Sequence, residues 1–230
     1  MRYFLFVSIL CLFSACKVKE YQNALPVAAA VADRYPNQSR VYQPKFDKIL
    51  YSCVVEGRTP LGKHYRLSGL LFIKQLEEGK RVVFQNQMGI TYFDFGWDRE
   101  GKFTVYAIMP QMNKAPLIKT LKKDFELLMF YNLPDKYTGI YALPSYPDHH
   151  FMRYELEKGF VYYVFDKQQH LQRIENANER KKVILIKTSN SEIGSLPDTI
   201  NINHLKAHFT IQLQQLNTNN TQTTEDVITE

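Results

Sequence analysis

The residues of this chain whose types could support catalysis are few and scattered. Asp94, Asp98 and Glu100 gather around a predicted turn at Trp97. Paired carboxylates can act as general acid and general base when they share a sheltered site. Charged residues at the tip of a hairpin are instead typical of a solvated turn. We therefore expect this acidic group to face water.

Histidine spacing raises the question of a metal site. His204 and His208 are four residues apart, which suits metal binding on a helix. The residues around them, NINHLKAHFT, favour a turn that leads into a strand, which would separate the two rings. His149 and His150 are adjacent on a predicted strand and would point to opposite faces. We expect histidines at the surface or in turns, and no metal site.

Cys53 lies within the strand-like run ILYSCVV, where burial as a small apolar side chain is the expected role. A nucleophilic cysteine would need a base and electropositive surroundings. The sequence also contains no G-x-S-x-G elbow, phosphate loop, H-E-x-x-H or C-x-x-C motif. We predict that the protein is not an enzyme and uses no cofactor.

The first sixteen residues carry the most specific pattern in the chain. Arg2 precedes an apolar run from Tyr3 to Phe13, which is the layout of a secretory signal peptide and too short to span a bilayer. The run ends in Phe-Ser-Ala-Cys, and this segment resembles the lipobox of bacterial lipoproteins, with Phe13 in place of the usual leucine. An ordinary signal peptide with an incidental cysteine is the alternative.

That resemblance implies cleavage after residue 15, acylation of Cys16, and attachment to the membrane through the acyl chains. Lys17 in the position after the cysteine implies the outer membrane of a bacterial cell envelope. Residues 16–43 have little periodicity and three nearby prolines, so we expect a flexible tether. Residues 215–230 are polar and predicted to be disordered.

Overall composition favours β-structure. The 230 residues include fifteen Tyr, fifteen Phe and one Trp, and aromatic rings pack well on a pleated surface. The net charge of +6 is spread along the chain, without the basic stripe and interleaved aromatics of a nucleic-acid groove. We expect no nucleic-acid partner.

Residues 44–214 are predicted to form one mainly β (α+β) domain. Turn signals rich in charge and glycine separate short alternating runs, which is typical of hairpins in an antiparallel meander. About eleven strands are expected: 49–55, 65–73, 81–85, 91–95, 103–109, 151–156, 160–165, 170–174, 183–186, 200–202 and 209–213.

One amphipathic helix interrupts this meander. Its apolar face carries Ile118, Leu121, Phe125 and Leu128, and we expect Asp124 to lie away from that face with the neighbouring lysines. Several strands are apolar on both faces, for example residues 161–165, VYYVF, and need cover on both sides. We expect a curved sheet, or incomplete barrel, wrapped on this helix.

Two connecting segments have open interpretations. Residues 134–147 contain three prolines and are predicted to form a long loop over a cavity mouth. Residues 85–89, QNQMG, predict either a tight turn with Gly89 at positive φ or a polar lip on a ligand cavity.

The order of lipobox, tether, meander, inserted helix and further meander is similar to the LolA/LolB type of lipoprotein carrier. The ending LPDTINI, residues 196–202, followed by an alternating last strand, is the most particular point of likeness. The resemblance implies an incomplete barrel that encloses an apolar cavity for acyl chains. It carries over no functional residue.

Two hypotheses follow. The first is an anchored lipoprotein that binds a lipid or lipoprotein acyl chains, as a carrier or receptor; the second is a scaffold or accessory lipoprotein of an envelope complex, with a filled core and no ligand. Under the first, ten apolar residues are expected to line the cavity: Leu71, Ile73, Phe84, Tyr92, Phe103, Val105, Leu121, Phe125, Tyr162 and Val164.

Overall fold

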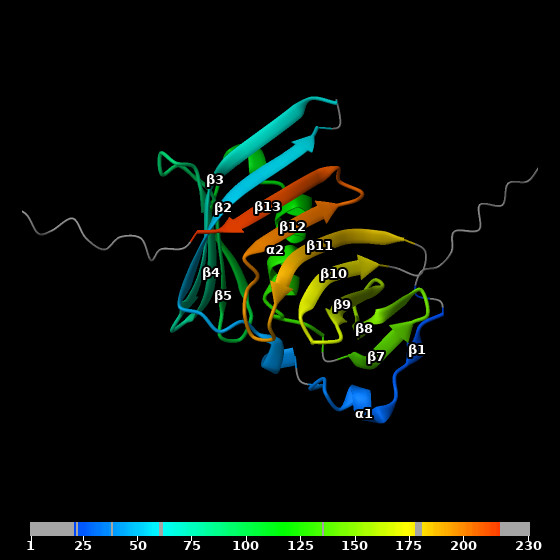
Figure 1. The fold of residues 1–230 in the computed structure, drawn as a ribbon. Coiled ribbons are helices and arrows are strands. Elements are labelled where there is room, and N and C mark those ends of the chain that lie inside the picture. Colours follow the sequence, from blue (N-terminus) through cyan, green and yellow to red (C-terminus); the bar gives the residue numbers. More distant parts are fainter. Residues whose placement is uncertain are drawn as a thin grey trace, which may run out of the picture.

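The computed structural model describes residues 21, 23–37, 39–59, 62–134, 136–177 and 181–216. Cys16, the signal-like segment and most of the polar tail lie outside these residues. Within them, no helix is long and apolar enough to cross a membrane. The predicted fold class is confirmed, because the domain is a single open antiparallel sheet curved around one substantial helix (Figure 1).

The sheet has thirteen strands in the order β1-β7-β8-β9-β10-β11-β12-β13-β2-β3-β4-β5-β6. Consecutive strands from β2 to β6 and from β7 to β13 are neighbours in the sheet, and the pairing of β13 with β2 joins the two halves. The strands are β1 (Leu25–Pro26), β2 (Lys48–Arg58), β3 (His64–Leu76), β4 (Gly79–Gln85), β5 (Thr91–Asp98), β6 (Phe103–Ile108), β7 (Tyr137–Leu143), β8 (Tyr146–Glu155), β9 (Phe160–Asp166), β10 (Leu171–Ala177), β11 (Lys182–Ser191), β12 (Thr199–His204) and β13 (Phe209–Gln215).

The prediction of a long loop at residues 134–147 was wrong. Half of that segment is β7, which pairs with β8 over its length apart from two irregularities. The prolines that suggested a loop lie before β7, in the β7–β8 turn and at the start of β8, where a missing N–H is tolerated. Strand β1 was not predicted either. It consists of two residues that pair with β7 and form the edge of the sheet.

The concave face of the sheet packs on helix α2 (Ala115–Leu128), which Figure 1 shows in the hollow between β4–β5 and β11–β13. The predicted apolar face is largely confirmed, since Leu121, Phe125 and Leu128 are fully enclosed. Polar contacts fix the helix at both sides. Trp97 on β5 donates a 2.9 Å hydrogen bond to Glu126, and Tyr163 on β9 donates one of 2.9 Å to the Leu127 carbonyl.

The strands that are apolar on both faces are covered on both faces. On β9, Tyr163 and its inward-facing neighbours join the main core under α2. Tyr162 and Val164 point outward into a second cluster, which is completed by Tyr21 and Ala24 from the N-terminal segment. The inner apolar face of β9 is thus covered by the helix, and the outer apolar face by the chain's own N-terminal segment.

Much of the predicted tether is therefore ordered structure. Residues 23–37 and 39–43 include β1, the short helix α1 (Ala29–Ala32) and the 3₁₀ helix η1 (Ser39–Tyr42). Tyr42 is 1% exposed and stacks on Phe130 with ring centroids 5.5 Å apart. Sequence periodicity missed this segment because isolated aromatic anchors, rather than a repeating apolar pattern, hold it against the sheet.

Replacing Tyr42 with alanine tests whether this segment belongs to the core. Removing so large a buried ring should lower the free energy of unfolding by about 3–5 kcal/mol, measured by urea denaturation. The Tyr42 hydroxyl is buried with no hydrogen-bond partner among the described residues. Tyr42→Phe should therefore change stability by less than about 1 kcal/mol. Equal, small effects of both substitutions would show that the segment is a tether after all.

Candidate ligand cavity

An apolar cavity of about 550 Å³ lies between the concave face of the sheet and α2. Its walls come from β2, β3, β4, β5 and β13 on one side and from Leu117, Leu121 and Phe125 of α2 on the other. The main wall residues are Cys53, Val55, Leu67, Leu71, Phe84, Phe93, Leu117, Leu121, Phe125, Phe209 and Ile211.

The alternation of the strands decides which side chains face this space. Leu67 and Leu71 on β3, and Cys53 and Val55 on β2, line the cavity. Gly69, which lies between the two leucines and pairs with Cys53, does not line it. A Cβ at Gly69 would lie 1.9 Å from the Gln85 carbonyl oxygen, so the close approach of the β4 backbone requires glycine there.

The ten residues expected to line a cavity are divided among three environments. Leu71, Phe84, Leu121 and Phe125 line it together. Four others pack in the main core away from its walls, namely Ile73, Tyr92, Phe103 and Val105. Tyr162 and Val164 lie in the outer cluster, on the opposite side of the sheet, so their assignment to an inner wall was wrong.

The mouth of the cavity is polar and positively charged. Arg58 and Thr59 border it at the β2–β3 turn, Gln111 and Lys114 in the link between β6 and α2, and Ala207 in the β12–β13 turn. Residues 85–89 do not line the cavity, and Gly89 has a φ of 81°, so the tight-turn interpretation of that segment is confirmed.

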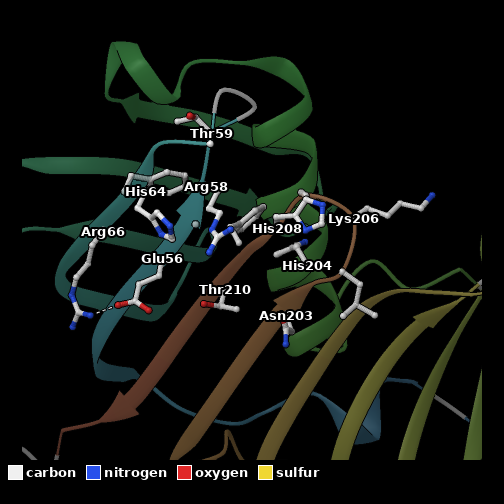
Figure 2. A pocket seen from close by; sticks show the side chains of 16 residues that line it. Glu56, Arg58, Thr59, His64, Arg66, Asn203, His204, Lys206, His208 and Thr210 are labelled. Atoms are coloured by element: carbon white, nitrogen blue, oxygen red, sulfur yellow. Dashed lines mark hydrogen bonds and ion pairs between the residues drawn. The ribbon is translucent and has the colours of Figure 1, made fainter.

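Outside the mouth, an open groove of about 1280 Å³ separates the β2–β3 hairpin from the β12–β13 turn (Figure 2). It shares Arg58, Thr59 and Ala207 with the cavity. The figure shows the groove bordered by basic side chains from both hairpins: Arg58, His64, Arg66, Lys206 and His208. Arg66 is paired with Glu56 on the neighbouring strand.

A buried acid–base pair supports the cavity wall from behind. Asp124 on α2 is fully buried, and its Oδ2 lies 2.9 Å from Nε2 of His204 at the end of β12. Among the described residues, neither oxygen of this carboxylate has a hydrogen-bond partner. The His204 ring stacks on Phe209, a wall residue, with centroids 3.9 Å apart. The pair thus ties the helix to the strand whose turn borders the mouth.

Sequence reasoning missed this pair, because it placed Asp124 away from the apolar helix face and His204 at the surface or in a turn. Helix α2 is buried along its apolar face and also on the side beside that face, where Asp124 lies. Asp124 follows Leu117 by seven residues and precedes Leu128 by four, which are spacings that place it on the buried flank. That spacing was the available signal.

The remaining candidate groups do not form a reactive site. Cys53 is 1% exposed, as expected for a small buried side chain, and burial raises the pKa of its thiol to about 12. Asp94 forms a two-point ion pair with Arg81, at 2.7 Å for each contact. Within the described part of the chain, no three His, Cys, Asp or Glu side chains are grouped so as to hold a metal ion.

Asp124 gives the domain a pH dependence of defined sign. Burial raises the pKa of this carboxyl above 3.8, and the nearby His204 and Lys123 oppose that shift. The folded state therefore holds the proton more tightly than the unfolded state, and the associated stabilisation is lost as pH rises through the folded-state pKa. In Asp124→Asn, the free energy of unfolding relative to the native protein should increase from pH 4 upward, measured by urea denaturation.

Asp148→Asn is the matched control. This exposed carboxyl has a pKa below its usual value because Lys167 bonds to it, so its contribution changes only below about pH 4. The difference from the native protein should be flat from pH 4 to 7. A relative stability of Asp124→Asn that declines over the same range would contradict a raised pKa.

No protein-family model matches the chain, and no curated protein matches it. The fold is similar to that of a protein domain named for outer membrane lipoprotein sorting, from Vibrio parahaemolyticus, with a TM-score of 0.44, 6% identity, and coverage of 82% of this chain and 89% of that one. The fold is also similar to that of a LolA superfamily protein from Nitrosomonas europaea, with a TM-score of 0.43, 9% identity, and coverage of 84% of this chain and 93% of that one. For a DUF1329 family protein from Desulfovibrio piger, the TM-score is 0.41 and the identity 11%, with coverage of 82% of this chain and 89% of that one. At these identities the likeness concerns the fold alone.

Proposed function

We propose that this chain is a membrane-anchored envelope lipoprotein that binds an acyl chain in the cavity between α2 and the sheet. The observation that carries the proposal is the cavity itself, an apolar space of about 550 Å³ between α2 and the sheet. Its volume falls within the roughly 300–1,000 Å³ typical of sites for small ligands.

The walls suit a hydrocarbon chain. They are aliphatic and aromatic side chains, and the polar atoms that border the cavity lie at its mouth. An apolar space of this kind is not filled favourably by water. Each methylene group transferred from water into such a space is stabilised by about 0.8 kcal/mol. A long alkyl chain therefore gains more here than a compact polar metabolite would.

The mouth suits an anionic head group. Arg58 and Lys114 are exposed on opposite sides of it, one on a strand end and one at the start of the helix. A carboxylate or phosphate at the end of an alkyl chain would meet these cations while the chain lies inside. The proposed ligand is therefore an acyl chain with an anionic head, presented free or as part of a lipid.

The proposed anchor is Cys16, through the lipobox-like segment that precedes it. Two or three acyl chains on one residue give stable membrane attachment, whereas a single chain gives only reversible binding. With Lys17 as the next residue, the outer membrane is the proposed location. The domain would then work beside the bilayer from which its ligand is drawn.

The scaffold hypothesis receives less support. It requires a filled interior and an apolar outer surface for a partner, but the interior has a cavity and the second apolar cluster is covered by the chain itself. A binding role for the interior accounts for both features.

Filling the cavity should abolish binding without unfolding the domain. Leu117 is half-buried at the mouth side of α2, and Leu117→Trp places a large ring in the space. The affinity for a fluorescent fatty acid, measured by titration, should fall at least tenfold, or by about 1.4 kcal/mol or more.

Val41→Trp serves as the matched control, because Val41 is 45% exposed and lies outside the cavity. Its affinity should stay within about twofold of the native value, and thermal unfolding of both variants should remain cooperative. Equal affinities of the native protein and Leu117→Trp would exclude this cavity as the binding site.

Anchoring has a separate test. Cells that express the full chain and are fed labelled palmitate should incorporate the label, and Cys16→Ser should remove it and release the protein from the membrane fraction. Cys11→Ser, in the same segment, should leave labelling unchanged. Label that persists in Cys16→Ser would refute the proposed attachment site.

A further inference from the structure

The N-terminal segment occupies a fixed place on the outer face of the sheet. The Tyr21 ring stacks on Tyr162 with centroids 3.7 Å apart and 7° between planes. Its hydroxyl donates a hydrogen bond to the buried Glu175, which also pairs with Lys182 at 2.9 Å. A little further along, Val27 donates a 3.2 Å backbone hydrogen bond to Ile140 on β7. Tyr21 is therefore part of the domain.

This attachment leaves very little chain between the domain and the proposed lipid. Four residues lie between Cys16 and Tyr21, so five residue-to-residue steps join their Cα atoms. A fully extended chain spans about 3.3–3.6 Å per residue, so the two Cα atoms are at most about 18 Å apart. With Cys16 acylated, the part of the domain around Tyr21 must stay close to the bilayer surface.

Strand directions show which end of the sheet this is. Neighbouring strands are antiparallel throughout, so alternate turns lie at the same end. Tyr21 stacks near the start of β9, three residues after the β8–β9 turn. We name this end of the sheet the mouth end. It also carries the β12–β13, β2–β3 and β4–β5 turns and the β6–α2 link. Figure 1 shows the end of β2, the β12–β13 turn and the end of β10 on one side of the molecule.

The two ends of the sheet carry opposite charge. In the described turns and terminal strand residues of the mouth end, the basic residues are Arg58, Lys63, Lys114, Lys158, Lys181, Lys182 and Lys206, against the acids Glu155 and Glu157. In the turns and terminal strand residues of the opposite end, the acids are Glu77, Glu78, Asp98, Glu100, Asp166, Glu192 and Asp198, against Lys48, Arg99, Lys102 and Lys167. An anionic bilayer would attract the first end and repel the second.

Exposed apolar side chains add to the mouth end. Met88 in the β4–β5 turn is 81% exposed, and Leu205 in the β12–β13 turn is 44% exposed. Leu205 is followed by Lys206, and an exposed apolar side chain beside a lysine is typical of surfaces that contact lipid head groups.

We propose that the mouth end is a docking surface for an anionic phospholipid bilayer, and that the packing of Tyr21 on Tyr162 orients the domain with its cavity mouth toward the head groups. The inference rests on the proposed acylation of Cys16. Because Tyr21 is docked on the sheet, only a short connection joins the domain to the proposed lipid, in place of a tether that holds the domain away from the membrane.

Depth-dependent fluorescence quenching tests this orientation. A fluorescent amino acid is introduced at Leu205, at the mouth end, or at Glu77, at the opposite end. The acylated protein is reconstituted into vesicles of phosphatidylglycerol and phosphatidylethanolamine that contain a lipid with a nitroxide on its head group. Quenching at position 205 should exceed quenching at position 77 about threefold or more, because the short connection holds the mouth end at the surface.

Tyr21→Ser removes the stacking and the hydrogen bond, and should bring the two quenching values to within about 1.5-fold of each other by lengthening the free connection. Tyr106→Ser is the control, because Tyr106 is 57% exposed on β6, at the other edge of the sheet, and the ratio should not change. Equal quenching at both positions in the native protein, or stronger quenching at position 77, would overturn the proposal.

Failure of acylation is recognised separately, by intact mass. If Cys16 carries no acyl group, the same measurement is made after coupling a synthetic diacyl maleimide to Cys16 of the chain that begins at this residue. Cys53 does not compete, since it is buried. Orientation is thereby tested whether or not the cell acylates the protein.

Discussion

The burial of one helix in the concave face of a strongly curved sheet is the interaction on which the rest of the structure depends. An isolated helix of fourteen residues is marginal in water, and an uncovered apolar sheet face would aggregate. Each element therefore stabilises the other. The fit is incomplete between Cys53 on β2 and Leu117 and Leu121 on the helix, and the space that remains there is the candidate binding site. Binding capacity is thus a consequence of how the core is packed.

Charge and topology act together in this account. An antiparallel meander brings alternate turns to one end, so residues far apart in sequence, such as Arg58 and Lys206, meet around the mouth. The same rule gathers the acidic turns at the other end. A ligand with an anionic head and a membrane with an anionic surface would therefore be attracted to the same face of the domain.

The sequence predicted the large features well because they depend on local periodicity. The helix, its apolar face and eleven of the strands follow from spacings of three to four residues or of two. Period-two alternation cannot say which face is inner when both are apolar, and for this reason Tyr162 and Val164 were assigned to the wrong side. Which inner-face residues line the cavity depends on how closely the helix packs on each strand, which is a tertiary property. The ordered N-terminal segment and the Asp124–His204 pair likewise depend on contacts between distant residues.

The decisive measurement of whether the cavity holds an acyl chain is native mass spectrometry. The protein is purified from its membrane into a detergent whose mass differs from that of any lipid. The account predicts a population heavier than the acylated chain by the mass of one fatty acid or phospholipid, and loss of that population in Leu117→Trp. A single species at the mass of the ligand-free chain, unchanged after incubation with fatty acid, would contradict it.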